Sequence, residues 1–186
     1  LKMEKIKTEI NGLYVIQNKS HKDNRGLFQE MWNQIKMKDQ KLIADFSQDN
    51  ISTSKQNVLR GLHFQNYPHD QLKFIQVIKG KILDVAVDIR RKSSTFGKYF
   101  SIELSSINQK GLWIPKGFAH GFAALEENTI VLYKCSGAYN PSEEYTIKWN
   151  DENLNINWGI SNPIISKKDQ MGMSLRDYII NKKLNN

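Results

Sequence analysis

Short segments in which apolar and polar side chains alternate constrain the fold of this chain more than any other feature. The clearest is ILDVAVDI at residues 82–89, and a second runs through residues 100–105. Successive side chains of a strand point to opposite faces, so each segment predicts a half-buried β-strand. Similar segments, separated by turns rich in Gly, Asn and Pro, occupy residues 13–16, 28–32, 58–65, 72–78, 112–114, 118–125 and 130–135.

Helical periodicity is sparse, and its best examples are residues 33–42 and 174–181. Many short strands at regular spacing, with few short helices, predict an all-β sandwich, jelly roll or barrel. The 186 residues contain no internal repeat, low-complexity tract or linker, so we expect a single domain over residues 1–186. A chain of this length is long enough to bury a core.

Charge and composition narrow the classes of partner. The formal net charge is +8, but the basic residues are scattered, with short clusters at 90–92, 167–168 and 182–183. Nucleic-acid-binding proteins concentrate such residues on one face, so we expect no nucleic-acid partner. No apolar run approaches the ~20 residues that span a bilayer, and the first residues carry no apolar signal segment, so we expect no membrane partner. The single cysteine, Cys135, excludes an internal disulfide and favours the cytoplasm.

Two short apolar segments each carry one histidine. VLRGLHFQ at 58–65 contains His63, and WIPKGFAHGF at 113–122 contains His120. A single histidine in a strand is most often a core residue whose imidazole is simply packed. Two imidazoles on a rigid sheet, with Arg60 and Lys73 close in sequence to the first, favour instead a site that binds an anion and moves protons.

An ordered set of motifs resembles the RmlC family, the dTDP-4-dehydrorhamnose 3,5-epimerases of the cupin superfamily. Each motif alone is weak, and their order makes the resemblance specific over about residues 6–169. The motifs are DNRGLF (23–28), QDN (48–50), NVLRGLHFQ (57–65), DVAVDIR (84–90), STFG (94–97), IPKGFAHGF (114–122), YK (133–134), YNP (139–141), WND (149–151) and SKKD (166–169).

The resemblance implies a double-stranded β-helix, or jelly roll, that acts as an isomerase without a cofactor. The implied reaction is epimerisation of a nucleotide-diphosphate 4-keto sugar at C3 and C5, closest to dTDP-4-dehydro-6-deoxyglucose. It also implies a homodimer in which N-terminal residues complete the neighbour's pocket. Three alternatives remain open: epimerisation of a GDP-linked 4-keto heptose for capsule synthesis, 3,4-ketoisomerisation, and non-catalytic binding of a sugar nucleotide on the same fold.

A metal centre is the rival interpretation, because many cupins hold a metal through three histidines and a glutamate. Here Gln65 stands where a second His would follow His63, and Lys73 takes the place of the Glu. A protonated Lys has no lone pair to offer a metal. We therefore expect no metal, and we expect the other histidines, His21 and His69, at the surface.

The chemistry that the resemblance implies assigns four catalytic roles. His63 is the base, since an imidazole titrates near neutral pH. Asp169 orients its ring. Tyr133 is the acid on the opposite face of the sugar, and Lys73 stabilises the developing enolate oxygen. From sequence alone, Asp169 would be a turn residue and Tyr133 a packing residue.

The remaining matched positions are expected to bind the nucleotide, the diphosphate and the sugar. They are Arg25, Glu30, Gln48, Asp49, Asn50, Arg60, Lys73, His120, Tyr139, Glu144 and Lys168. Arg suits a bidentate phosphate contact and Lys a point-charge contact. One conflict remains, because Arg60 and His63 would face opposite ways on a regular strand. Either the chain bends near Gly61, or Arg60 reaches the ligand at the barrel rim.

Overall fold

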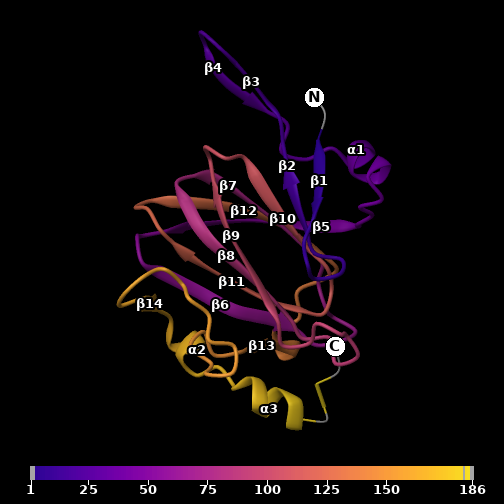
Figure 1. Cartoon of the computed structure of the whole chain (residues 1–186), viewed down its shortest axis with the longest axis vertical. Coiled ribbons are helices and arrows are strands. Elements are labelled where there is room, and N and C mark those ends of the chain that lie inside the picture. The colour runs from indigo at the N-terminus through magenta and orange to yellow at the C-terminus, as the bar shows by residue number, and fades with distance from the viewer. Residues whose placement is uncertain (1–2, 182, 185–186) are drawn as a thin grey trace.

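The computed structural model describes residues 3–181 and 183–184. Over these residues two six-stranded sheets face each other, and a separate two-stranded hairpin projects from them (Figure 1). The strands of each sheet are antiparallel along the main path. The two facing sheets form the expected jelly roll, so the predicted fold class is confirmed.

The first sheet has the strand order β1-β2-β10-β7-β12-β5. Its strands are β1 (Glu4–Lys7), β2 (Tyr14–Gln17), β10 (Lys110–Ile114), β7 (Lys73–Lys79), β12 (Thr129–Ser136) and β5 (Phe46–Ser54). The second sheet has the order β13-β6-β11-β8-β9, and β14 pairs with β6 in parallel. Its strands are β13 (Glu144–Thr146), β6 (Val58–Gln65), β11 (Phe118–Ala124), β8 (Lys81–Asp88), β9 (Tyr99–Ser105) and β14 (Ile164–Ile165).

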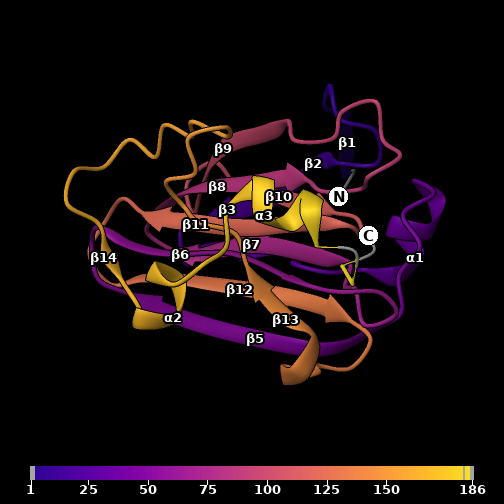
Figure 2. The same cartoon turned by 90° about the horizontal axis from the view of Figure 1, so that it is seen from below.

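The remaining elements are short. The projecting hairpin consists of β3 (Ser20–Asp23) and β4 (Gly26–Gln29), and the helices are α1 (Gln34–Asp39), α2 (Lys167–Gln170), α3 (Leu175–Ile180) and the 3₁₀ turn η1 (Pro141–Glu143). Seen from below, the C-terminal segment with β14, α2 and α3 lies against the second sheet (Figure 2). No helix in the part of the chain described here is long and apolar enough to cross a membrane.

Three apolar clusters hold these layers together. The space between the sheets is filled at one end by side chains such as Ile75, Ile82 and Phe122. The outer face of the second sheet packs against the C-terminal segment, for example through Leu59 and Tyr178. The outer face of the first sheet packs on the segment around α1. Alternation in β8 therefore separates two buried faces, so its polar side chains point into the molecule rather than to solvent.

Every strand expected from the sequence is present, with shifted ends, as are the two expected helices. The expected strand at 28–32 ends at Gln29, because β4 is half of the exposed hairpin. The nine-residue strand β5 escaped detection because its sequence, FSQDNISTS, is polar on both faces. Helix α2 is a single turn, too short to show a 3.6-residue period.

Candidate functional site

A cluster of polar side chains lies between the two sheets, beside the apolar cluster that contains Ile75, Ile82 and Phe122. The second sheet contributes His63 on β6, His120 on β11 and Asp84 on β8. The first sheet contributes Lys73 on β7 and Tyr133 on β12. His63 and His120 are direct partners across β6 and β11, so their side chains lie side by side on one face.

His63 is held by Asp169. Its Nε2 lies 2.6 Å from Oδ1 of Asp169, and the second carboxylate oxygen accepts the Gly61 N–H at 3.1 Å. Asp169 is 3% exposed, on the single turn of α2, where the Ser166 hydroxyl caps its backbone N–H at 3.1 Å. Burial opposes ionisation of Asp169, but the hydrogen bond and charge of His63 and the Gly61 N–H together lower its pKa. Ionised Asp169 accepts a hydrogen bond from the Nε2–H group of a neutral His63 ring, which leaves Nδ1 as the basic atom.

A β-bulge resolves the conflict between Arg60 and His63. His63 pairs with His120 and Arg60 with Phe122, so β6 carries one extra residue between these pairs. Gly61 occupies the bulge at φ +112°, and a Cβ there would lie 2.6 Å from the Cα of Gly121. The bend near Gly61, one of the two expected solutions, places both side chains on one side of the strand.

Arg60 and His63 line a surface pocket of about 290 Å³ together with Lys168 and Asp169. The Arg60 guanidinium donates to the Ser54 hydroxyl at 3.2 Å and the Thr53 carbonyl at 3.3 Å, which ties it to β5. Two cations beside an imidazole suit an anionic ligand.

His120 is paired with a buried aspartate that sequence reasoning did not single out. Its Nε2 lies 2.7 Å from Oδ1 of Asp84, which is fully buried. The second oxygen, Oδ2, has no hydrogen-bond partner among the described residues. In the sequence, Asp84 belongs to the polar half of an alternating strand. The available signal of its burial is that its neighbour on that face, Ala86, is apolar.

Lys73 and Tyr133 face these groups from the first sheet. Burial lowers the pKa of the Lys73 ammonium, and the nearby Cys135, Glu144 and Asp84 oppose this shift only in part. Burial raises the pKa of the half-buried Tyr133, so its hydroxyl keeps its proton. Cys135 is the direct strand partner of Lys73 and was not expected in the site. Burial raises the pKa of its thiol, which therefore stays protonated near neutral pH.

Three further expected residues form a hydrogen-bonded group at the rim. Glu144 accepts the Tyr139 hydroxyl at 2.7 Å and pairs with the Lys168 ammonium. Burial of Glu144 disfavours its charge, but Lys168 and Tyr139 outweigh this effect and lower its pKa. The group links the loop after β12, strand β13 and α2 above His63.

The motif at 48–50 divides between two faces of β5. Gln48 donates to the Asn50 side chain at 2.9 Å, and the Asn50 amide lies 3.8 Å from the Cys135 sulfur, so both face the cavity. Asp49 points to the other face of the sheet, where Lys134 donates to it at 2.8 Å. The structure does not bring Asp49 to this site.

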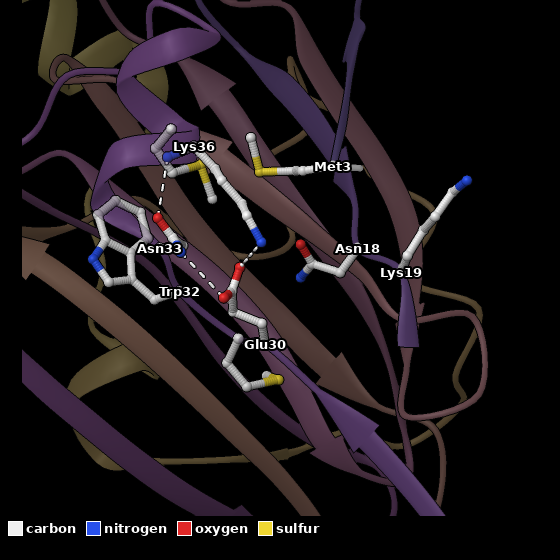
Figure 3. A pocket seen from close by; sticks show the side chains of 9 residues that line it. Met3, Asn18, Lys19, Glu30, Trp32, Asn33 and Lys36 are labelled. Atoms are coloured by element: carbon white, nitrogen blue, oxygen red, sulfur yellow. Dashed lines mark hydrogen bonds and ion pairs between the residues drawn. The ribbon is translucent and has the colours of Figure 1, made fainter. Parts of the chain in front are cut away.

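Arg25 and Glu30 also lie away from the site within one chain. The β3–β4 hairpin projects from the body (Figure 1). Arg25 is in its turn, where the guanidinium forms an ion pair with Asp23 at 2.6 Å. Glu30 follows the hairpin and lines a small pocket near the N-terminus, held by Lys36 at 2.6 Å and the Asn33 amide at 3.1 Å (Figure 3). The hydrogen bonds of Lys36 and Asn33 lower the pKa of Glu30.

The residues at the two altered cupin positions do not form a metal site. The Gln65 amide is engaged by backbone groups of two loops, and Lys73 offers an ammonium. Among residues 3–181 and 183–184, no three His, Cys, Asp or Glu side chains converge as metal ligands would. His21 is exposed as expected, and His69 is half-buried. That the protein works without a metal stays a prediction, based on these side-chain types.

Together these groups can move a proton on a bound molecule. A carboxylate-supported imidazole lies on one sheet, and a protonated phenol lies on the facing sheet. An ammonium beside them can stabilise negative charge in a water-poor pocket. This combination fits deprotonation at a carbon beside a carbonyl, followed by reprotonation from the other side.

Comparison with known proteins identifies the family. The profile described as dTDP-4-dehydrorhamnose 3,5-epimerase matches residues 7–177. The chain is 46% identical over 168 residues to a dTDP-4-dehydrorhamnose 3,5-epimerase of Salmonella typhimurium, covering 88% of this chain and 91% of that relative.

Solved structures agree with the sequence comparison. The RmlC epimerase of Legionella pneumophila, in complex with dTDP-4-keto-L-rhamnose, superposes with a TM-score of 0.93 at 38% identity, covering 99% of this chain and 98% of that one. A 3'-monoepimerase of Streptomyces bikiniensis in complex with dTDP-quinovose gives 0.91 at 26% identity, with 97% and 92% covered. With its fold, its motifs and nearly its whole length matched, this chain belongs to the dTDP-4-dehydrorhamnose 3,5-epimerase family.

Proposed function

We propose that this protein epimerises a nucleotide-diphosphate 4-keto sugar at C3 and C5, with dTDP-4-dehydro-6-deoxyglucose as its substrate. The observation that carries the proposal is the opposition of the His63–Asp169 pair on one sheet to Tyr133 on the other. Pure binding of a sugar nucleotide needs no base and acid on opposite sides of the ligand. Relatives over nearly the whole chain bear the name of this reaction.

The reaction needs no redox partner. Nδ1 of His63 takes the proton from the carbon beside the C4 ketone, and the C–H electron pair moves into an enolate. The Lys73 ammonium stabilises the negative charge on the enolate oxygen. The Tyr133 hydroxyl then donates its proton to the opposite face of the same carbon, which inverts it. A proton from solvent restores the phenol, and His63 releases its proton to solvent.

The surrounding groups suit the rest of the substrate. Arg60 and Lys168 lie in the pocket beside His63 and are positioned for the diphosphate. His120 presents an imidazole to the sugar, while Gln48 and Asn50 offer amides from the first sheet. Tyr139 and Glu144 at the rim provide an aromatic face and a carboxylate for the nucleoside.

We also propose that the active form is a homodimer in which the β3–β4 hairpin enters the pocket of the partner. The hairpin projects from the body, and its Leu27 and Phe28 are 53% and 67% exposed. Arg25 at its turn is 86% exposed and paired with Asp23, so an anionic ligand would compete with that carboxylate for the guanidinium. Burial of these two apolar side chains in a neighbouring subunit would stabilise the dimer, because it removes apolar surface from water. The reduced, buried Cys135 suits the cytoplasm as the place of action.

The decisive experiment follows hydrogen exchange during turnover. The purified protein is incubated in deuterium oxide with dTDP-4-dehydro-6-deoxyglucose and, in parallel, with GDP-linked 4-keto sugars. Mass spectrometry and NMR then locate deuterium and configuration. Deuterium at both C3 and C5 of the dTDP sugar, with inversion, is the expected result. Exchange only with a GDP-linked sugar would show that the substrate is GDP-linked and not the dTDP sugar. A 3-keto product would indicate a ketoisomerase. Exchange with none of the sugars would exclude an epimerase.

The dimer has a separate test. Arg25→Ala and His63→Asn variants, each of low activity, are mixed after dissociation and reassociation. If the hairpin acts on the partner's pocket, mixed dimers contain one site with both residues intact, and activity returns to about a quarter of the wild-type level at equal mixing, by the statistics of random pairing. No recovery would show that Arg25 acts within its own chain.

A further inference from the structure

The side chain of Gln65 ties two loops to the strand that carries the base. It lies at the end of β6, is 6% exposed, and faces the same side as His63. Its Nε2 donates to the His69 carbonyl at 2.7 Å and, over a longer 3.5 Å, to the Ala138 carbonyl. Its Oε1 accepts the Asn140 N–H at 2.6 Å. One amide therefore uses both its donor and its acceptor on backbone groups.

Two of these contacts lie on either side of Tyr139. Ala138 and Asn140 are its chain neighbours, so the Gln65 amide forms hydrogen bonds to the backbone both before and after Tyr139. Tyr139 itself is 52% exposed and is held otherwise by its hydroxyl, which donates to Glu144 at 2.7 Å. Ser47 bonds the Gly137 carbonyl at the start of the loop, two residues earlier.

The backbone of Gln65 completes the arrangement. Gln65 is the direct strand partner of Glu144, the acceptor of the Tyr139 hydroxyl. Its main chain thus places Glu144, while its side chain places the backbone of Tyr139. Gln65 thus fixes both ends of the segment from Ala138 to Glu144 to the end of β6, and the neighbouring Asn66 N–H bonds the Glu143 carbonyl within it at 2.9 Å.

We propose that Gln65 is a positioning residue that sets Tyr139 against the nucleotide of the substrate. The inference rests on the proposed function, in which Tyr139 contacts the nucleoside. Gln65 touches neither the substrate nor the reacting atoms in this assignment. It holds the aromatic ring at the rim through the loop backbone, and so it controls binding rather than proton transfer.

The chemistry of the side chain matters because only an amide supplies a donor and an acceptor in this shape. Met has a similar length but satisfies neither the Asn140 N–H nor the two carbonyls. Glu keeps an acceptor for Asn140, but its ionised carboxylate would face the His69 and Ala138 carbonyls without a proton to donate. Both replacements should release the loop and leave His63 in place.

The test compares Gln65→Met and Gln65→Glu with a matched control. Gln76→Met replaces another buried glutamine, 2% exposed on the outer side of the first sheet, and reports the general cost of such a change. KM and kcat for the dTDP sugar, the Kd for dTDP, and the melting temperature are measured for each. We expect KM and Kd to rise on the order of fivefold in both Gln65 variants, the scale of one lost hydrogen bond, with kcat little changed. Gln76→Met should leave KM, Kd and kcat at the wild-type values.

A double-mutant cycle decides whether Gln65 acts through Tyr139. In a Tyr139→Ala background, Gln65→Met should raise KM no further, because the ring that it positions is absent. Unchanged KM and Kd in folded Gln65 variants, or full additivity with Tyr139→Ala, would overturn the inference. A wild-type protein that neither binds dTDP nor turns over any sugar nucleotide would overturn the proposed function and this inference with it.

Discussion

Asp169 contacts His63 through Nε2, at 2.6 Å, and not through Nδ1. The ionised carboxylate accepts a hydrogen bond from Nε2–H, so the lone pair that accepts a proton from substrate is on Nδ1. The second Asp169 oxygen is bound by the Gly61 N–H, in the bulge that turns Arg60 to the same side as His63. The bulge and the base are thus coupled through one carboxylate.

His63→Asn should abolish most turnover while the protein stays folded. The side chain is partly exposed and its loss leaves no large cavity, but the base is gone. We expect kcat to fall by roughly 10²–10⁴-fold, the usual contribution of a positioned acid–base group. Steady-state kinetics with circular dichroism measure both quantities. Near-normal kcat in a folded variant would remove His63 from the mechanism.

Asp169→Asn should lower kcat less than His63→Asn, because Asp169 orients the ring and transfers no proton. It should also change acid stability. The pKa of Asp169 is lowered in the folded protein, so its charge stabilises the fold above the ordinary Asp value of about 3.9, and this stabilisation is lost as pH falls through the lowered pKa. Urea unfolding from pH 6 downward should show a shallower loss of unfolding free energy in the variant. Parallel curves for the two proteins would contradict this.

Lys73 should set the alkaline limit of activity. Its lowered pKa means that the ammonium loses its proton below the ordinary Lys value of about 10.4, and kcat/KM, which reports the free enzyme, should fall as pH rises through that lowered pKa. Tyr133, whose pKa is raised, stays protonated over this range. In Lys73→Arg the charge persists, so the alkaline fall should move to higher pH even if kcat is smaller. Lys134→Arg, on the outer face of the first sheet, is the control. If the alkaline fall in activity stays at the same pH in Lys73→Arg, a group other than Lys73 sets it.

Gly61→Ala should destabilise the protein and displace the base. The new Cβ would lie 2.6 Å from both the Gly121 Cα and the His120 carbonyl oxygen, at φ +112°. We expect the free energy of unfolding to fall by more than about 2 kcal/mol, beyond the strain of a positive φ alone. Gly159→Ala is the control, because Gly159 also has a positive φ, +67°, but nothing lies within 4 Å of the added Cβ. Its loss of stability therefore measures the backbone strain without a clash. Equal losses in the two variants would show that the bulge tolerates a side chain.

Chelation should leave activity unchanged. The cupin ligand positions hold Gln65, whose amide is engaged by loop backbone, and Lys73, whose ammonium has no lone pair. Dialysis against EDTA, with elemental analysis before and after, tests this. About one Zn, Fe, Ni or Mn per chain, with activity lost on chelation and restored by that metal, would overturn the cofactor-free mechanism.

Several site residues were within reach of the sequence, and others were not. The family resemblance of the motifs pointed to His63, Lys73 and Tyr133, which the fold brings to one cavity. Asp84 was missed because alternation predicts a half-buried strand, whereas both faces of β8 are buried. Asp49 matched a motif, yet its parity on β5 sends it to the outer face beside Lys134.

Alternation and turn residues by themselves determined an all-β chain of short strands, since the period of two is a local property of the backbone. Only the tertiary structure decided which side chains meet. His63 and Asp169 are far apart in sequence, and their contact requires β14 to pair with β6 and α2 to turn back over it. The orientation of Arg60 depends on a bulge that the close approach of Gly61 and Gly121 permits. Such contacts arise from the pairing of strands and the packing of segments that are far apart in the chain, which local sequence periodicity does not encode.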